Sequence, residues 1–154
     1  MPSLLTLCPM QINQIRMMQA ELSAKRSKCI SLKVGSIIVV DDRIVSEGFN
    51  GTPKGYINCC DNFTEYNSDH HDWSSTYEIH AEMNAIIYSA KKGISIDGGV
   101  IYSTTKPCLQ CTKNIIASGI KKIYYKDDYS KNNDIELNEF LKACNIEIER
   151  VVYE

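Results

Sequence analysis

The chain has 154 residues, of which 44% are hydrophobic and 23% are charged, and its formal net charge is −2. This composition is typical of a globular protein, and the length suits one domain with its own core. The small negative charge argues against tight binding of a long nucleic-acid backbone, and no stretch approaches the roughly 20 apolar residues of a membrane span. We therefore expect a single cytoplasmic domain over residues 1–154 that binds neither nucleic acid nor membrane.

Hydrophobic periodicity predicts the secondary structure in chain order. An apolar residue every three or four positions indicates an amphipathic helix at residues 10–26. Its apolar stripe consists of Ile12, Ile15, Met18 and Leu22. β-Branched residues then predict a hairpin of two strands, 33–40 and 43–49, with its turn at Asp41 and Asp42. The later predicted elements are a helix at 78–92, a strand at 100–104, a helix at 108–118, a strand at 120–125, a helix at 134–144 and a strand within 146–152.

Alternation of helices and strands after a hairpin indicates an α/β fold, with a mixed five-stranded sheet and helices on both faces. The predicted apolar side of the helix at 78–92 is Ile79, Met83, Ile86, Ile87 and Ala90. Residues 51–77 break the pattern, because they form a long insertion without convincing periodicity. Such loops are usually functional or tied down. The potential ligands and the tryptophan of this insertion are Cys59, Cys60, His70, His71 and Trp73.

Seven cysteines are a high and odd number for a chain of this length. No signal-peptide pattern points to an oxidising compartment, so metal binding is favoured over a disulfide framework. Cys8 and Cys144 lie outside any ligand pattern, and we expect both to be small buried apolar residues.

His80-Ala81-Glu82, followed by Pro107-Cys108-Leu109-Gln110-Cys111, is the most informative pattern in the chain. It matches the His-x-Glu and Pro-Cys-x-x-Cys signature of zinc-dependent nucleobase deaminases. His80, Cys108 and Cys111 would fill three corners of a zinc tetrahedron, and the fourth would stay open for water, as in catalytic sites. Cys108 and Cys111 share one helical face, and the positive end of their helix would stabilise the thiolates.

Glu82 is then expected to be a proton shuttle and not a zinc ligand. His80 and Glu82 can approach one centre only if their helix starts near Glu78. Zinc would lower the pKa of its bound water to about 7. Glu82 would take the water's proton as hydroxide attacks the ring carbon that bears the amino group, and would return protons to the ring nitrogen and to ammonia. A dry pocket should raise the pKa of Glu82. The plainer alternative is a Cys-x-x-Cys redox pair with an unrelated surface histidine.

The chain resembles the deoxycytidylate (dCMP) deaminases, and its compact size is similar to that of their phage and viral members. The resemblance extends from Ser27 to Val152 and includes segments beyond the zinc signature. The segments that carry it are Ser27-Lys28-Cys29, Lys33-Val34-Gly35, Gly48-Phe49-Asn50-Gly51-Thr52-Pro53, Asn58-Cys59-Cys60-Asp61, Trp73-Ser74-Ser75, Glu78-Ile79-His80-Ala81-Glu82-Met83-Asn84-Ala85-Ile86 and Thr105-Lys106-Pro107-Cys108-Leu109-Gln110-Cys111.

This resemblance implies a cytidine-deaminase-like three-layer α/β/α fold and the hydrolysis of dCMP to dUMP and ammonia, which supplies dUMP for dTTP synthesis. It also implies a homohexamer that is activated by dCTP and inhibited by dTTP at a separate site. Mg²⁺ would accompany the triphosphate effector, and a viral member would act in the host cytoplasm.

The resemblance further implies that Asn50 binds the sugar and that Val34 lines the base pocket. The effector site would border Gly48, Phe49, Asn50 and Gly51, so a nucleotide that shifts this turn would reposition Asn50. From the residues alone, Asn50 could equally be a turn asparagine in left-handed geometry, and Val34 a plain core residue. None of the candidate phosphate-binding cations can be ranked from the sequence. They are Lys28, Lys33, Arg43 and Lys54.

A second, structural zinc on Cys29, Cys59, His70 and Glu78 is also implied by the resemblance. Two thiolates, an imidazole and a carboxylate make a closed four-ligand site. It would pin the insertion at 51–77 to the end of the first helix and to the start of the catalytic helix. Cys60 and His71 are neighbours that could substitute in this ligand set. The plain alternative is that all four are ordinary buried, turn, surface and capping residues.

Other functions stay open at this point. A deaminase of dCTP, cytosine, guanine or a tRNA adenosine would use the same zinc chemistry, although a tRNA enzyme should show a basic face. A nucleic-acid-editing domain would need aromatic residues that stack along a positive groove. A catalytically silent zinc-binding module would need neither Glu82 nor an open metal position.

Overall fold

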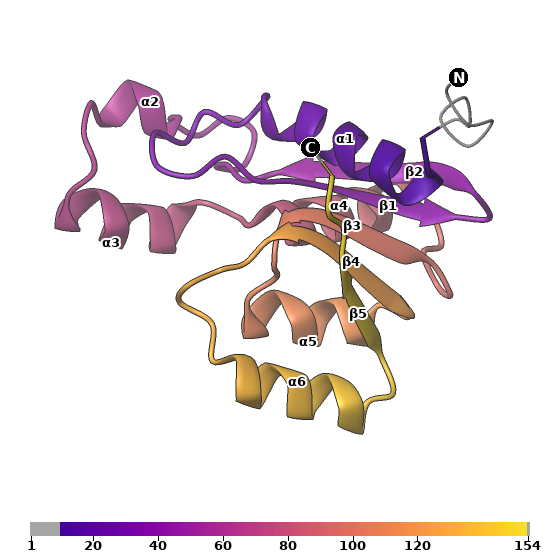
Figure 1. Cartoon of the computed structure of the whole chain (residues 1–154). Helices are drawn as coiled ribbons and strands as arrows, with labels where there is room; N and C mark the ends of the chain where they lie inside the picture. Colours follow the sequence, from indigo (N-terminus) through magenta and orange to yellow (C-terminus); the bar gives the residue numbers. More distant parts are fainter. Residues whose placement is uncertain (1–9, 154) are drawn as a thin grey trace, which may run out of the picture.

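The computed structural model describes residues 10–153, and its elements follow the predicted alternation with two additional helices (Figure 1). Cys8 therefore lies outside the described residues. The elements in chain order are α1 (Ile12–Ala24), β1 (Gly35–Val40), β2 (Arg43–Phe49), α2 (Cys59–Asn62), α3 (Ser68–Tyr77), α4 (Ala81–Lys92), β3 (Val100–Thr105), α5 (Leu109–Ala117), β4 (Lys122–Asp127), α6 (Asp134–Ala143) and β5 (Glu147–Arg150). No helix in this part of the chain is long and apolar enough to cross a bilayer.

One mixed sheet with the strand order β2-β1-β3-β4-β5 forms the centre of the molecule. β1 pairs antiparallel with both β2 and β3, whereas β3, β4 and β5 run parallel to one another. Asp41 and Asp42 connect β1 to β2 with φ angles of 49° and 61°. Two positive φ angles suit a tight hairpin turn whose twist matches that of its strands. The predicted hairpin and the mixed five-stranded sheet are therefore confirmed.

Helices cover both faces of this sheet, as the predicted three-layer fold requires (Figure 1). On one face, α1 packs over a core that includes Met17, Ile37 and Tyr102. On the other face, α4, α5 and α6 pack over Ile38 and Ile101 and their neighbours. Because successive strand residues point to opposite faces, each central strand contributes to both cores.

α1 buries a different side from the one that its sequence suggested. Its buried residues are Met17, Ala20, Ser23 and Ala24. The predicted apolar stripe is exposed, to 51% at Ile12 and 63% at Leu22. Small residues face the sheet because the backbone approaches closely there. A Cβ atom at Gly35 would lie 2.1 Å from the carbonyl oxygen of Ala20.

The start of α4 also differs from the prediction. The helix begins at Ala81 and not near Glu78, and His80 is its N-cap residue, with extended backbone angles of −64° and 152°. Glu78 is instead the C-cap residue of α3. The buried side of α4 also includes Glu82 and Ala85, whereas Ile87 and Ala90 of the predicted apolar side are exposed. The predicted C-cap glycine, Gly93, is confirmed in left-handed geometry.

The insertion at residues 51–77 is not a plain loop, because it contains α2 and α3. Asn67 caps α3, and its side chain accepts a hydrogen bond from the His70 amide at 2.8 Å. Figure 1 places both helices to one side of the sheet. Cys144 follows α6 and is exposed, so the expectation that it is buried was wrong.

Candidate active site and metal centres

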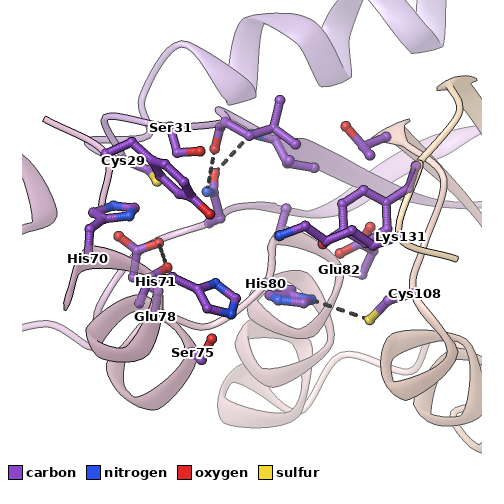
Figure 2. Close-up of a pocket in the computed structure, with 18 of the residues that line it drawn as sticks. Cys29, Ser31, His70, His71, Ser75, Glu78, His80, Glu82, Cys108 and Lys131 are labelled. Carbon is purple, nitrogen blue, oxygen red and sulfur yellow. Dashed lines mark hydrogen bonds between the residues drawn. The ribbon is translucent and has the colours of Figure 1, made fainter. Parts of the chain in front are cut away.

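His80, Cys108 and Cys111 meet where the N-termini of α4 and α5 converge. His80 and Cys108 are the N-cap residues of the two helices, and Cys111 lies in the first turn of α5. The Nδ1 atom of His80 lies 3.3 Å from the Sγ atom of Cys111 and 3.5 Å from that of Cys108. Figure 2 shows the His80 ring turned toward the Cys108 sulfur. The sequence-predicted ligands are therefore adjacent in the structure.

These distances fit a tetrahedral zinc ion. Zinc bonds of about 2.0–2.1 Å to nitrogen and about 2.3 Å to sulfur place the two ligand atoms about 3.5 Å apart at tetrahedral angles. One imidazole and two sulfurs are also the soft ligand set that zinc favours. With three protein ligands, a fourth position would stay open, as catalytic chemistry requires.

The three ligands also perturb one another electrostatically. A hydrogen bond from the Cys111 thiol and another from His80 lower the pKa of Cys108, which favours its thiolate form. The pKa of Cys111 is raised, because its thiol donates to Cys108 and is buried. The adjacent Cys108 sulfur raises the pKa of His80, and burial opposes that effect. Cys108 and Cys111 therefore share one negative charge beside the His80 imidazole, and this environment favours the binding of a cation.

Glu82 is buried beside these ligands, with 4% of its surface exposed. It lies in the first turn of α4, and its Oε1 atom accepts a hydrogen bond from the Ser103 hydroxyl at 2.8 Å. Burial raises the pKa of Glu82, and the bond from Ser103 opposes this shift. A carboxyl group that is nearly dry and yet borders a cavity is suited to accept and return a proton.

A cavity of about 290 Å³ extends over this site. Glu82, His80 and Cys108 line it together with Val34 and Asn50, the two predicted substrate contacts. The Asn50 side chain is anchored to the segment before β1, because its Nδ2 atom donates to the Leu32 carbonyl at 2.7 Å and its Oδ1 atom accepts from the Val34 amide at 2.9 Å. Its backbone is not left-handed, so the turn-asparagine alternative does not apply.

Sequence reasoning missed several side chains of this cavity. Lys131 comes from the loop before α6 and His71 from α3, and both line the cavity that contains Glu82. In Figure 2 they lie on either side of His80. Hydroxyl groups of Ser31, Ser75 and Tyr129 line the same space. Apart from Ser75, which stands in the Trp73-Ser74-Ser75 segment, no motif marks these residues. They come together from the segment before β1, the insertion and the loop before α6.

A second cluster brings together Cys29, Cys59 and His70, whose ligand atoms all lie within 4.8 Å of one another. The Cys59 sulfur is 3.0 Å from Nε2 of His70, and all three residues are buried. Their neighbours Cys60 and His71 are both exposed and lie outside this cluster. Of the neighbouring residues Cys59 and Cys60, and His70 and His71, the structure therefore places Cys59 and His70 in the cluster.

The second cluster has unsatisfied polar atoms that suit a cation. The Glu78 Oε1 atom, an acceptor, is buried without a hydrogen-bond partner among the described residues. The His70 Nδ1 atom also has none there, and it would carry the ring proton if Nε2 bound a metal. Burial raises the pKa of Cys59 to about 12, and burial followed by the charge of Glu78 raises the pKa of Cys29. A divalent ion would reverse this preference for neutral thiols. Cys29, Cys59 and His70 therefore form a candidate three-ligand metal site. Glu78, the fourth predicted ligand, lies beside Cys29 but is not among the ligand atoms that gather within 4.8 Å of one another.

A second cavity, of about 1,090 Å³, lies on the other side of the Gly48–Gly51 segment. Gly48, Phe49 and Gly51 line this cavity, whereas Asn50 between them lines the Glu82 cavity. Lys28 and Lys54 belong to the second cavity, and Lys33 and Arg43 line neither. The cations at its wall are Arg26, Lys28, Lys54 and Lys91.

Comparison with known proteins agrees with this geometry. The family described as "Cytidine and deoxycytidylate deaminase zinc-binding region" matches residues 10–127. The deoxycytidylate deaminase of Enterobacteria phage T4 is 37% identical over 82% of this chain and 86% of its own length. ComE operon protein 2 of Bacillus subtilis is 40% identical over 90% of this chain and 70% of its own length.

Among solved structures, the dCMP deaminase of cyanophage S-TIM5 in complex with dCMP and dUMP matches with a TM-score of 0.76 and 35% identity. That match covers 93% of this chain and 100% of the cyanophage chain. Sequence, fold and zinc-ligand geometry thus agree, and this chain belongs to the cytidine and deoxycytidylate deaminase family.

Proposed function

We propose that this chain is a zinc-dependent deaminase that hydrolyses dCMP to dUMP and ammonia and so supplies dUMP for dTTP synthesis. The observation that carries the proposal is the buried Glu82 carboxyl, which borders the same cavity as His80, Cys108, Val34 and Asn50. The names of the phage relatives and the dCMP and dUMP in the cyanophage complex support dCMP as substrate. Unpaired thiols on the six described cysteines suit the reducing cytoplasm, the host's if the protein is viral.

His80, Cys108 and Cys111 would hold the catalytic zinc, which when bound supplies Lewis-acid activation of a water molecule. Glu82 accepts a proton from the attacking water and gives it to the ring nitrogen of cytosine. Glu82 then takes the second proton of the same water and passes it to the departing amine, so that dCMP and water become dUMP and ammonia. The raised pKa of Glu82 favours this exchange, because the group can hold the proton between the two transfers.

The remaining substrate contacts follow from the cavity wall. Asn50 would bind the sugar with the hydrogen-bonding capacity that Leu32 and Val34 leave free, since an amide has two donors and two lone pairs. Val34 would pack against the base. Lys131 would face the 5′-phosphate with its positive charge, and His71 could donate a hydrogen bond to the same group. Lys106, the other lysine there, is already paired with Asp134 at 3.0 Å.

Cys29, Cys59, His70 and Glu78 would hold a second, structural zinc. This ion would join the end of α1, the insertion and the residues just before α4, and would thereby fix the position of His80. Its direct test is metal analysis of the purified protein. Two zinc ions per chain are expected for the native sequence and for His71→Ala, whereas His70→Ala should bind one. A native protein with one zinc ion per chain would refute the second site.

The second cavity would be the effector site. Lys28, Lys54 and Lys91 at its wall suit a triphosphate accompanied by Mg²⁺, whereas Arg26 is already paired with Glu47 at 2.9 Å. Because Asn50 faces the substrate cavity and its neighbours face the second one, a nucleotide that moves Phe49 or Gly51 would also move Asn50. dCTP should therefore lower the dCMP concentration at half-saturation, and dTTP should raise it. Hyperbolic kinetics that neither nucleotide changes would contradict this regulation.

A homohexamer is the proposed assembly. The exposed apolar stripe of α1 supports association, since such a surface is unfavourable in water. Light scattering should give a mass of six times the 17.4 kDa of the chain. A monomeric mass at micromolar concentration would contradict the assembly.

Glu82→Gln tests the proposed reaction most directly. The variant keeps the shape of the side chain but cannot shuttle a proton, so kcat for dCMP should fall by about 10²–10⁴-fold. Zinc content and thermal stability should stay at the native values, because Glu82 is not a ligand. Native turnover by a zinc-loaded Glu82→Gln protein would refute the role of Glu82.

A further inference from the structure

Two buried hydroxyl groups lie directly behind Glu82 in the central sheet. Ser36 of β1 and Ser103 of β3 are register partners in the antiparallel pairing of these strands. Both are fully buried, with 0% exposure, and their Oγ atoms are 3.1 Å apart. The Ser103 Oγ atom is in turn 2.8 Å from Oε1 of Glu82. A continuous chain of hydrogen bonds therefore runs from β1 through β3 to the carboxyl group on α4.

The direction of this chain follows from the inventory of donors and acceptors. An ionised carboxylate only accepts hydrogen bonds, so the Ser103 hydroxyl must donate its one proton to Glu82. Ser103 can then only accept from Ser36, which donates. A buried hydroxyl needs a partner of this kind, and here each one fixes the orientation of the next. Ser103 holds Oε1 of Glu82, and the residue also lines the cavity, where Oε2 is the oxygen that Ser103 does not bind.

We propose that Ser103 and Ser36 are positioning residues for the proton transfer by Glu82. Ser103 holds one carboxylate oxygen against the sheet and so keeps the other aimed into the cavity. Ser36 acts through Ser103, because it keeps that hydroxyl oriented as a donor. This inference rests on the proposed deaminase function, but its structural part, the placement of the Glu82 side chain, holds independently of the substrate.

Ser103→Ala removes the bond to Glu82 without adding volume. A hydrogen bond to a charged group contributes enough that kcat for dCMP should fall by about tenfold to a hundredfold. KM and zinc content should stay within about twofold of native, because Ser103 contacts neither substrate nor metal. Ser103→Thr and Ser103→Val have the same shape and differ only in the hydroxyl group. Thr should keep most of the activity and Val should match Ala.

Ser36→Ala and the double variant test the relay itself. Ser36→Ala should lower kcat by about two- to fivefold, and adding it to Ser103→Ala should cause no further loss, since coupled residues are not additive. Ser89→Ala is the matched control, because the buried Ser89 hydroxyl lies on α4, bonds the Ile86 carbonyl at 2.6 Å and lines neither cavity. It should leave kcat at the native value.

A crystal structure of metal-free Ser103→Ala gives a readout that does not depend on activity. The Glu82 carboxylate should leave its native position or occupy two rotamers. A native rotamer, a kcat of Ser103→Ala within about twofold of native, or equal activity of the Thr and Val variants would each overturn the proposal. If the Thr and Val variants do not fold, the kcat and the crystal structure of Ser103→Ala test the proposal alone. Lack of dCMP turnover by the native protein would refute the proposed function, while the crystal structure would still test the positioning.

Discussion

Gly48→Ala should destabilise the protein and displace the helix that carries Glu82, because β2 and α4 leave no space for a methyl group. A Cβ atom at Gly48 would lie 2.3 Å from the carbonyl oxygen of Ala81 and 2.5 Å from the amide nitrogen of Ala85. Both atoms belong to the backbone, so no side chain can rotate away. The helix would have to move by about 1 Å to restore an ordinary contact of 3.4 Å.

Overpacking of this kind costs about 1–3 kcal/mol, and contact with backbone places Gly48→Ala near 3 kcal/mol. In a chain of this size each 1 kcal/mol lowers Tm by about 2–4 °C, so Tm should fall by about 6–12 °C. A shift of about 1 Å at the catalytic helix can also cost about a hundredfold in rate. Calorimetry and dCMP turnover would measure the two effects.

Gly51→Ala is the matched control for stability. Its Cβ atom would meet only a ring carbon of Phe49, at 4.0 Å, and the residue does not require left-handed backbone. Its Tm should stay within about 2 °C of native. A Gly48→Ala protein with native Tm and native turnover would refute the reasoning, because it would mean that β2 and α4 are not packed backbone to backbone.

Three further predictions concern other parts of the molecule. Lys131→Ala should raise KM for dCMP by about tenfold or more while KM for deoxycytidine stays unchanged, because the lost interaction is with the phosphate; equal effects on both substrates would contradict a phosphate contact. Removal of metal by a chelator should abolish turnover and lower Tm, and zinc should restore both; native Tm after complete removal would contradict a structural role for either ion. Burial raises the pKa of Tyr102 from 10.0 to about 12, so the Tyr102 hydroxyl loses its proton at a lower pH in the unfolded chain than in the folded one. The contribution of Tyr102 to the free energy of unfolding should therefore be full below pH 10 and should be lost as the pH rises to about 12. The decline should be about 2–3 kcal/mol smaller in Tyr102→Phe, as measured by denaturant unfolding between pH 9 and about 12, and identical pH profiles would contradict the raised pKa.

The zinc ligands could be predicted from sequence because their chemistry depends on short spacings. Cys108 and Cys111 lie in one helical turn, and Pro107 and the His-x-Glu motif mark the starts of two helices. The position of His80 needed the structure. As an N-cap residue it lies outside α4, so its ring reaches the sulfurs without the helix start near Glu78 that the motif suggested.

Other features depended on tertiary contacts that periodicity does not encode. A helical apolar stripe predicts α1, but the close approach of Gly35 selects the side with Ala20 and Ala24 for burial. α3 is mostly polar and was missed, although Asn67 is a recognisable N-cap. Ser36 and Ser103 are far apart in sequence and meet only through strand pairing, so no local pattern indicates their contact with Glu82.

Ammonia release from the purified, zinc-loaded chain would test the central claim most directly. The substrates are dCMP, dCTP, deoxycytidine, cytosine and guanine, each with and without dCTP or dTTP as effector where it is not the substrate. Selective turnover of dCMP, raised by dCTP and suppressed by dTTP, is the predicted result. Turnover of another base or phosphate form would contradict the substrate assignment, and no turnover of any of them with zinc bound would contradict the proposed deaminase function.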